Sequence, residues 1–209
     1  MKRLLACALC AFAFQATAVA HALDEYVQAA QIALAPDGVR VELRLTPGVF
    51  VAERVFALID SDGDGQLSTT EEEAYARRVL RDVALEVDGR PAPLALKRVE
   101  FPSRPEMEAG VGAIRLELAA EADLNAAGEH QLSFRSNHLP ELGVYLVNAL
   151  VPTANEIKLG RSERDPLQRE LRLSLQVTHA DALWPRTGVL MLCLCLALLS
   201  PLPLRRHER

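Results

Sequence analysis

The segment Gln28–Leu45, which reads QAAQIALAPDGVRVELRL, contains two alternating runs joined by a short turn. In the second run, Val39–Leu45, an apolar residue occupies every second position and charged residues fall between them. A period of two places the apolar side chains on one face of a strand. Ala35-Pro36-Asp37-Gly38 has the composition of a turn. The segment therefore predicts a β-hairpin with one buried face.

Similar short runs fill most of the remaining chain up to residue 177. They are Val83–Val87, Pro93–Phe101, Gly112–Ala119, Gln131–Arg135, Gly143–Val151, Glu156–Gly160 and Glu170–Val177. The turn Asp88-Gly89-Arg90-Pro91 predicts that the first two of these form a second hairpin. About nine short strands at this spacing predict a mainly β fold, an antiparallel sandwich of immunoglobulin-like type.

One stretch departs from the strand pattern and predicts two helices. Thr46-Pro47 has the residues expected at a helix N-cap and at the first helical position. From Val49 to Ile59 the apolar residues follow a helical spacing, and a second helical pattern runs from Thr69 to Asp82. We therefore expect a helix-loop-helix unit, inserted in the β-domain at residues 47–83.

The loop between these helices, Asp60–Glu71, reads DSDGDGQLSTTE and matches every diagnostic position of a twelve-residue calcium loop. Ca²⁺ takes six to eight oxygen ligands in a flexible cage. The expected ligands are the carboxylates of Asp60, Asp62 and Asp64, the backbone carbonyl of Gln66, Ser68 through water, and both carboxylate oxygens of Glu71. Bidentate closure favours Ca²⁺ over the smaller Mg²⁺. The alternative is an acidic, glycine-rich surface turn.

Other positions of the loop also have expected roles. Gly65 permits the sharp bend, and Leu67 is expected to face inward. Ser68-Thr69-Thr70-Glu71 is a capping-box pattern for the second helix, so Glu71 would serve both the helix and the metal. The sequence contains one such loop, whereas sensor proteins usually pair them. We therefore expect the ion to be a structural clamp or docking element, with a calcium-responsive regulator as the alternative.

The N-terminus has the pattern of a secretory signal peptide. Lys2 and Arg3 precede the apolar run Leu4–Phe14, and Ala20-His21-Ala22 is a small-x-small cleavage site. We expect cleavage after Ala22, which makes residues 1–22 a signal peptide. The alternative is an uncleaved anchor helix.

A second apolar run, Gly188–Leu204, contains no charged residue and is followed by Arg205, Arg206 and Arg209. Its length is at the lower end of what spans a bilayer. Trp184 would lie in the interface, and the basic residues place the tail 205–209 in the cytoplasm. We expect a transmembrane helix at residues 187–204 and a periplasmic β-domain at 23–182. A buried core helix and a processed sorting tail are the alternatives.

The charge and cysteine content of residues 23–186, the expected outer segment, exclude several kinds of partner and metal site. Residues 23–186 hold 27 acidic and 18 basic side chains, a net charge of −9, which makes nucleic acid a poor partner. The same residues contain no cysteine, so thiolate-bound zinc and iron–sulfur clusters are excluded there. No motif for nucleophilic, phosphate or dinucleotide chemistry occurs, and we expect no enzyme. His130, His138 and His179 could form a second metal site only if the fold gathers them.

The loop with its flanking helices, about Val49–Val83, resembles the EF-hand family. The leader, the run Leu23-Asp24-Glu25-Tyr26, the run Val144–Pro152 and the terminal apolar run together resemble bacterial exported, membrane-anchored EF-hand proteins. The β-rich outer domain is also similar to that of nickel/cobalt and hydrogenase/urease accessory membrane proteins, which have several transmembrane helices. These resemblances imply a calcium-binding periplasmic protein, held in the inner membrane by a single pass, with a protein partner that the sequence does not name. An accessory subunit of a metal-transport system is a further alternative.

Overall fold

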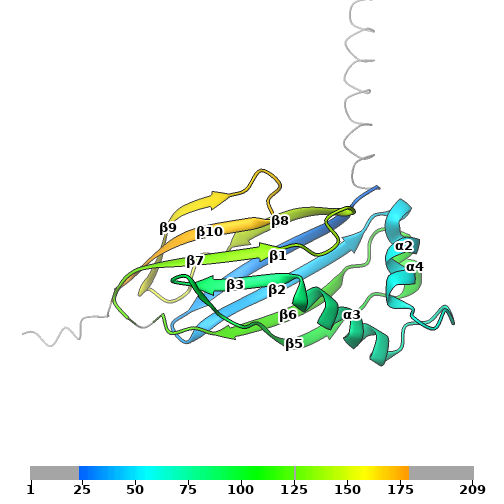
Figure 1. The fold of residues 1–209 in the computed structure, drawn as a ribbon, viewed down its shortest axis with the longest axis horizontal. Coiled ribbons are helices and arrows are strands. Elements are labelled where there is room, and N and C mark those ends of the chain that lie inside the picture. The colour runs from blue at the N-terminus through cyan, green and yellow to red at the C-terminus, as the bar shows by residue number, and fades with distance from the viewer. Residues whose placement is uncertain (1–23, 125, 179–209) are drawn as a thin grey trace, which may run out of the picture. The chain divides into compact units, whose positions relative to one another are not determined.

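The computed structural model describes residues 24–124 and 126–178, which form ten strands and three helices (Figure 1). The strands are β1 (Tyr26–Ala35), β2 (Gly38–Pro47), β3 (Val83–Val87), β4 (Arg90–Pro91), β5 (Ala95–Glu100), β6 (Ile114–Glu121), β7 (Gly128–Ser136), β8 (Gly143–Ala149), β9 (Ile157–Arg164) and β10 (Glu170–Val177). The helices are α2 (Val49–Ile59), α3 (Thr69–Arg81) and α4 (Arg104–Glu108). The chain is therefore mainly β, as the alternating runs predict.

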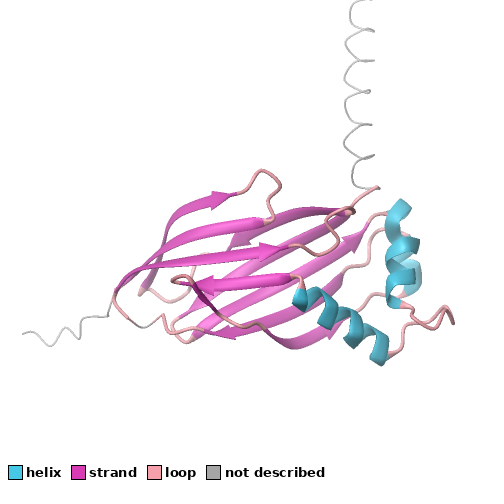
Figure 2. Ribbon diagram, in the orientation of Figure 1, coloured by secondary structure: helices cyan, strands magenta, loops and turns pink. Residues whose placement is uncertain are grey.

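The strands form two five-stranded sheets, shown in magenta in Figure 2. Sheet A has the order β5-β6-β2-β1-β8, and sheet B has the order β4-β3-β7-β10-β9. Alternate residues of the long strands are buried, as in β10, where Leu171, Leu173, Leu175 and Val177 are all at most 3% exposed. The inner faces of both sheets supply the same apolar core. Burial of alternate side chains is the physical reason that the period-two pattern identified the strands.

The hairpin predicted at residues 28–45 is confirmed. β1 and β2 pair antiparallel from Tyr26 with Pro47 to Ala35 with Gly38. The expected all-antiparallel pairing is wrong for one pair, because β1 and β8 run parallel. The alternating pattern could not reveal this, since it specifies the buried face of a strand and not the direction of its neighbour.

The second predicted hairpin is wrong in its pairing. The turn Asp88-Gly89 has positive φ at both residues, 53° and 72°, and joins β3 to the two-residue strand β4. The chain then crosses to the other sheet, where β5 pairs with β6. A turn with positive φ at both central residues fixes a hairpin locally but does not determine how far its strands stay paired.

The three helices gather at one end of the sheets (Figure 1). α2 and α3 carry the chain from β2 in sheet A to β3 in sheet B. The predicted start of α2 is wrong: β2 continues through Thr46 and Pro47, and the N-cap is Gly48, which makes no side-chain cap bond. α2 buries Val51, Ala52, Val55, Phe56 and Ile59, which leaves Phe50 outside this stripe and 73% exposed.

The capping box predicted for the second helix is confirmed. The Ser68 side chain accepts from the Glu71 amide, and the Glu71 side chain accepts from the Ser68 amide. The sequence pattern does not predict α4, which has its own capping box between Ser103 and Glu106 and buries Met107 completely. With five residues, this helix is too short to produce a clear hydrophobic period.

Several expectations concern residues outside the part that the structure describes. These are the signal peptide at 1–22, the transmembrane helix at 187–204, the tail at 205–209, and His179. Among residues 24–124 and 126–178, no helix has the length and apolar character needed to cross a bilayer.

Candidate metal centre

The predicted metal loop lies between α2 and α3. It begins directly after Ile59, which is 2% exposed, and it ends in the first turn of α3. Leu67 is half-buried and packs against the core, as expected for an inward-facing apolar residue of the loop. The apolar core therefore holds the start of the loop, through Ile59, and its second half, through Leu67.

Three of the predicted ligands come together. Asp60, Asp62 and Glu71 each offer a carboxylate oxygen, and these oxygens lie within 4.8 Å of one another. Two oxygens on the same Ca²⁺ can be at most about 5.2 Å apart, since each bond is about 2.3–2.6 Å long. The three carboxylates therefore lie close enough to share one ion, and an all-oxygen donor set suits a hard cation such as Ca²⁺.

The fourth predicted carboxylate, Asp64, is not part of this group, whereas the Gln66 carbonyl and Ser68 would contribute oxygens of other kinds. Asp64 is exposed, and its Oδ1 accepts from the Gln66 amide at 2.8 Å. Gln66 and Ser68 are also exposed, and the Ser68 hydroxyl donates to Glu71 Oε2 at 2.8 Å. The ligand roles of Asp64, Gln66 and Ser68 remain predictions.

Glu71 is 7% exposed and accepts several hydrogen bonds within the loop. Its Oε2 accepts from the Ser68 amide at 3.0 Å, and its Oε1 accepts from the Ser61 amide at 2.6 Å and from the Ser61 hydroxyl at 3.0 Å. The Ser68 amide and hydroxyl, followed by the Ser61 amide, lower the pKa of Glu71 to about 2. The side chain is therefore ionised at neutral pH, as a metal ligand must be.

Two glycines allow the loop to fold around its acidic side chains. Gly63 and Gly65 have φ values of 74° and 80°, a region that other residues rarely adopt. Their amides donate to the two carboxylate oxygens of Asp60, each at 2.9 Å. These bonds orient Asp60 toward the interior of the loop, and Gly65 has the bend predicted for it.

A buried polar network anchors α3 to the sheets. No sequence pattern predicts it. The Tyr26 and Tyr75 hydroxyls are 2.9 Å apart, and the Tyr75 hydroxyl is 3.0 Å from His138 Nε2. His138 is fully buried, and its Nδ1 lies 2.7 Å from Asp82 Oδ2. Because a carboxylate only accepts, Nδ1 carries the proton, and Nε2 then accepts from Tyr75. The four residues come from three segments distant in the sequence, β1, α3 with its C-cap, and the residues after β7, so no motif identifies them.

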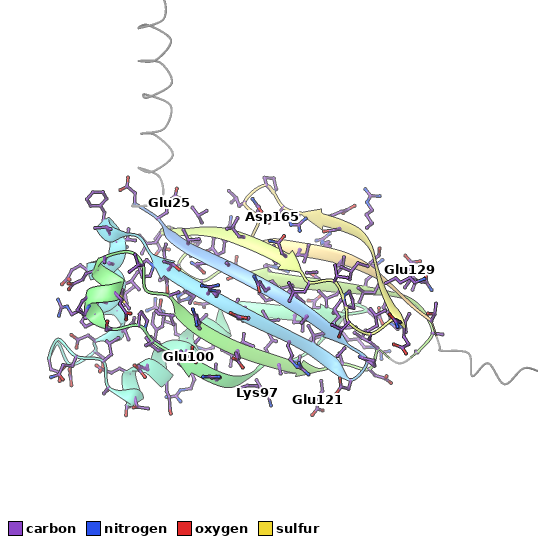
Figure 3. All side chains as sticks on the ribbon, turned by 180° about the vertical axis from the view of Figure 1, so that it is seen from behind. Glu25, Lys97, Glu100, Glu121, Glu129 and Asp165 are labelled. Atoms are coloured by element: carbon purple, nitrogen blue, oxygen red, sulfur yellow. The ribbon has the colours of Figure 1, made fainter. Side chains whose placement is uncertain are left out.

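His130 belongs to a separate network. Its Nδ1 lies 2.7 Å from Asp88 Oδ2, and its Nε2 lies 2.8 Å from the Ala126 carbonyl. Glu129, its neighbour in β7, lies at the end of the sheets opposite the helices, whereas Glu25 lies at the helical end (Figure 3). His138 contacts β1 and α3 at that helical end. The fold therefore does not gather His130 and His138 into one site.

The two histidines should affect the pH dependence of stability with opposite signs. Burial lowers the pKa of His138, whereas the Ala126 carbonyl and then Asp88 raise the pKa of His130, both from 6.5. His138 therefore contributes stability above about pH 6.5, which is lost as the pH falls through its lowered pKa. His130 contributes stability below about pH 6.5, which is lost as the pH rises through its raised pKa.

This difference can be measured with the variant His130→Gln. The free energy of unfolding of this variant, measured by urea titration, should decrease continuously from about pH 8 to pH 5. The reason is that the gain from His130 at low pH no longer offsets the loss from His138. The wild-type protein should show a shallower dependence over the same range. A flat profile for the variant would contradict the lowered pKa of His138.

Comparisons with known proteins do not assign this chain to a family. The sequence matches no protein-family model, and comparison with curated proteins and with solved structures likewise finds no match. Fold and site alone therefore define the class: a mainly β domain of two five-stranded sheets, with an acidic Asp60, Asp62 and Glu71 group that could hold a metal ion.

Proposed function

We propose that residues 60–71 bind one Ca²⁺ ion as a single EF-hand. The observation that carries this proposal is the grouping of Asp60, Asp62 and Glu71 within 4.8 Å, in the order and spacing of a calcium loop. Glu71 would bind the ion with both carboxylate oxygens and still accept from the Ser68 amide at the start of α3. Asp60, Asp62 and Asp64 would supply the other carboxylate ligands, together with the Gln66 carbonyl and a water held by Ser68.

The role we propose for the ion is a structural clamp. The loop lies in the connection between the two sheets, and both helices beside it are packed on the core. The ion would join the end of α2, through Asp60, to the start of α3, through Glu71. It would therefore stabilise the crossover from sheet A to sheet B, and a neighbouring protein could dock on the same helical end.

We further propose a non-enzymatic periplasmic protein, held in the inner membrane through residues 187–204 after removal of residues 1–22. The supports are the apolar runs and flanking arginines of the sequence. For the fold we propose an immunoglobulin-like sandwich, because two sheets of short strands enclose one core. Its partner would be a protein and not a nucleic acid, given the acidic outer segment.

A calcium titration of the purified protein tests this proposal. We expect a Kd of about 10⁻⁴–10⁻³ M, in the range of extracellular modules. At a hundredfold excess over Kd, the melting temperature should rise by about 5–10 °C, because the ion binds the folded state alone. Mg²⁺ at the same concentration should produce a smaller rise. The absence of any calcium-dependent shift would contradict the site.

A hydrophobic dye distinguishes the clamp from a calcium-responsive regulator. The clamp predicts that dye fluorescence stays constant as Ca²⁺ is added. The regulator predicts an increase, because an opened helix pair exposes apolar surface. Phe50 and Val111 are 73% and 74% exposed, so any increase must be measured against the dye fluorescence before Ca²⁺ is added.

A further inference from the structure

Arg104, the first residue of α4, is fixed between two helices. Its Nε donates to Glu108 Oε1 at 2.6 Å, and its Nη2 donates to Glu53 Oε2 of α2 at 3.3 Å. The guanidinium carbon lies 4.4 Å from the centre of the Phe56 ring, in cation–π contact. Two carboxylates and one aromatic face therefore hold this cation in one position.

That position is beside the metal loop. A Cβ atom added to Gly65 would lie 3.2 Å from Arg104 Nη1, so the guanidinium occupies the space next to the central bend of the loop. Arg104 also interacts electrostatically with Asp60, the first predicted ligand. Because an arginine stays protonated at all physiological pH values, its positive charge is permanent. Arg104 therefore brings a positive charge, itself paired with Glu53 and Glu108, beside the loop from outside its twelve residues.

We propose that Arg104 lowers the affinity of the loop for Ca²⁺ and so adjusts the site to a calcium-rich compartment. This inference rests on the proposed calcium binding at residues 60–71. Without metal, the guanidinium offsets repulsion among the carboxylates of the loop. When a divalent ion enters, the same charge repels it. A unit charge about 8 Å from a divalent ion changes affinity about fivefold even at the dielectric constant of water.

The variant Arg104→Gln in the full chain tests this inference by calorimetric titration with CaCl₂. We expect Ca²⁺ to bind about fivefold more tightly than in wild type at low ionic strength, and the difference to shrink as salt is added. Arg172→Gln is the matched control, because it removes the same charge from sheet B, where Arg172 bonds Glu170. Its Kd should equal that of wild type. Arg104→Lys retains the charge and should retain the weak binding.

The possible outcomes separate the two proposals. Unchanged or weaker binding by Arg104→Gln, in a variant whose circular dichroism shows the native fold, overturns the role of Arg104 and leaves the calcium site intact. If Arg104→Gln does not fold, tighter binding by Arg104→Lys overturns the inference instead. Absence of calcium binding by the wild-type protein overturns the proposed function and this inference together.

Discussion

Replacing Glu71 with glutamine should weaken Ca²⁺ binding on the order of 100-fold, because it removes the bidentate carboxylate and one negative charge from the loop. Glutamine is also accepted at the third position of a capping box, so α3 should still begin at Thr69. The substitution therefore separates the metal-binding role of Glu71 from its capping role. Isothermal titration with CaCl₂, together with helix content from circular dichroism, measures both roles.

Glu72→Gln is the matched control for this experiment. It makes the same change of charge one residue further along α3, where the side chain is half-buried and outside the Asp60, Asp62 and Glu71 group. Its calcium affinity should fall by no more than about fivefold at low ionic strength, far less than in Glu71→Gln, since a nearby charge outside the ligand set acts only through space. Wild-type affinity in Glu71→Gln would show that calcium, if bound, is bound elsewhere.

Replacing His138 with alanine should lower the free energy of unfolding by about 3–5 kcal/mol, a large part of the stability of a domain. The change leaves the buried Tyr75 hydroxyl and the Asp82 carboxylate without their imidazole partner. It also creates a cavity where a fully buried ring stood. Urea unfolding followed by fluorescence or circular dichroism measures the loss.

Asn137→Ala is the control, because Asn137 precedes His138 in the chain but is exposed. Its effect should stay within about 0.5 kcal/mol of zero. Tyr75→Phe should give an intermediate loss of about 1–3 kcal/mol, since it removes one hydroxyl and leaves the ring in place. If His138→Ala cost no more than Asn137→Ala, the network would not hold α3 on the sheets.

The residues of the site differ in how far sequence could predict them. Asp60, Asp62 and Glu71 are local to one loop, so their spacing and the glycine bend bring them together without distant partners. Tyr26, Tyr75, His138 and Asp82 come from β1, from α3 and its C-cap, and from the residues after β7. Their contacts depend on strand pairing and on how α3 packs. No local sequence pattern specifies either of these.

The same distinction describes the fold of residues 24–124 and 126–178. The sequence by itself determined the alternating strands, the β1–β2 hairpin, the two helices and the acidic loop, because each depends on residues a few positions apart. Only the tertiary structure decided the parallel pairing of β1 with β8, the crossing of β5 to sheet A, and the placement of Arg104 beside Gly65. These features join segments distant in the chain, and their positions follow from packing the two sheets and three helices on one core.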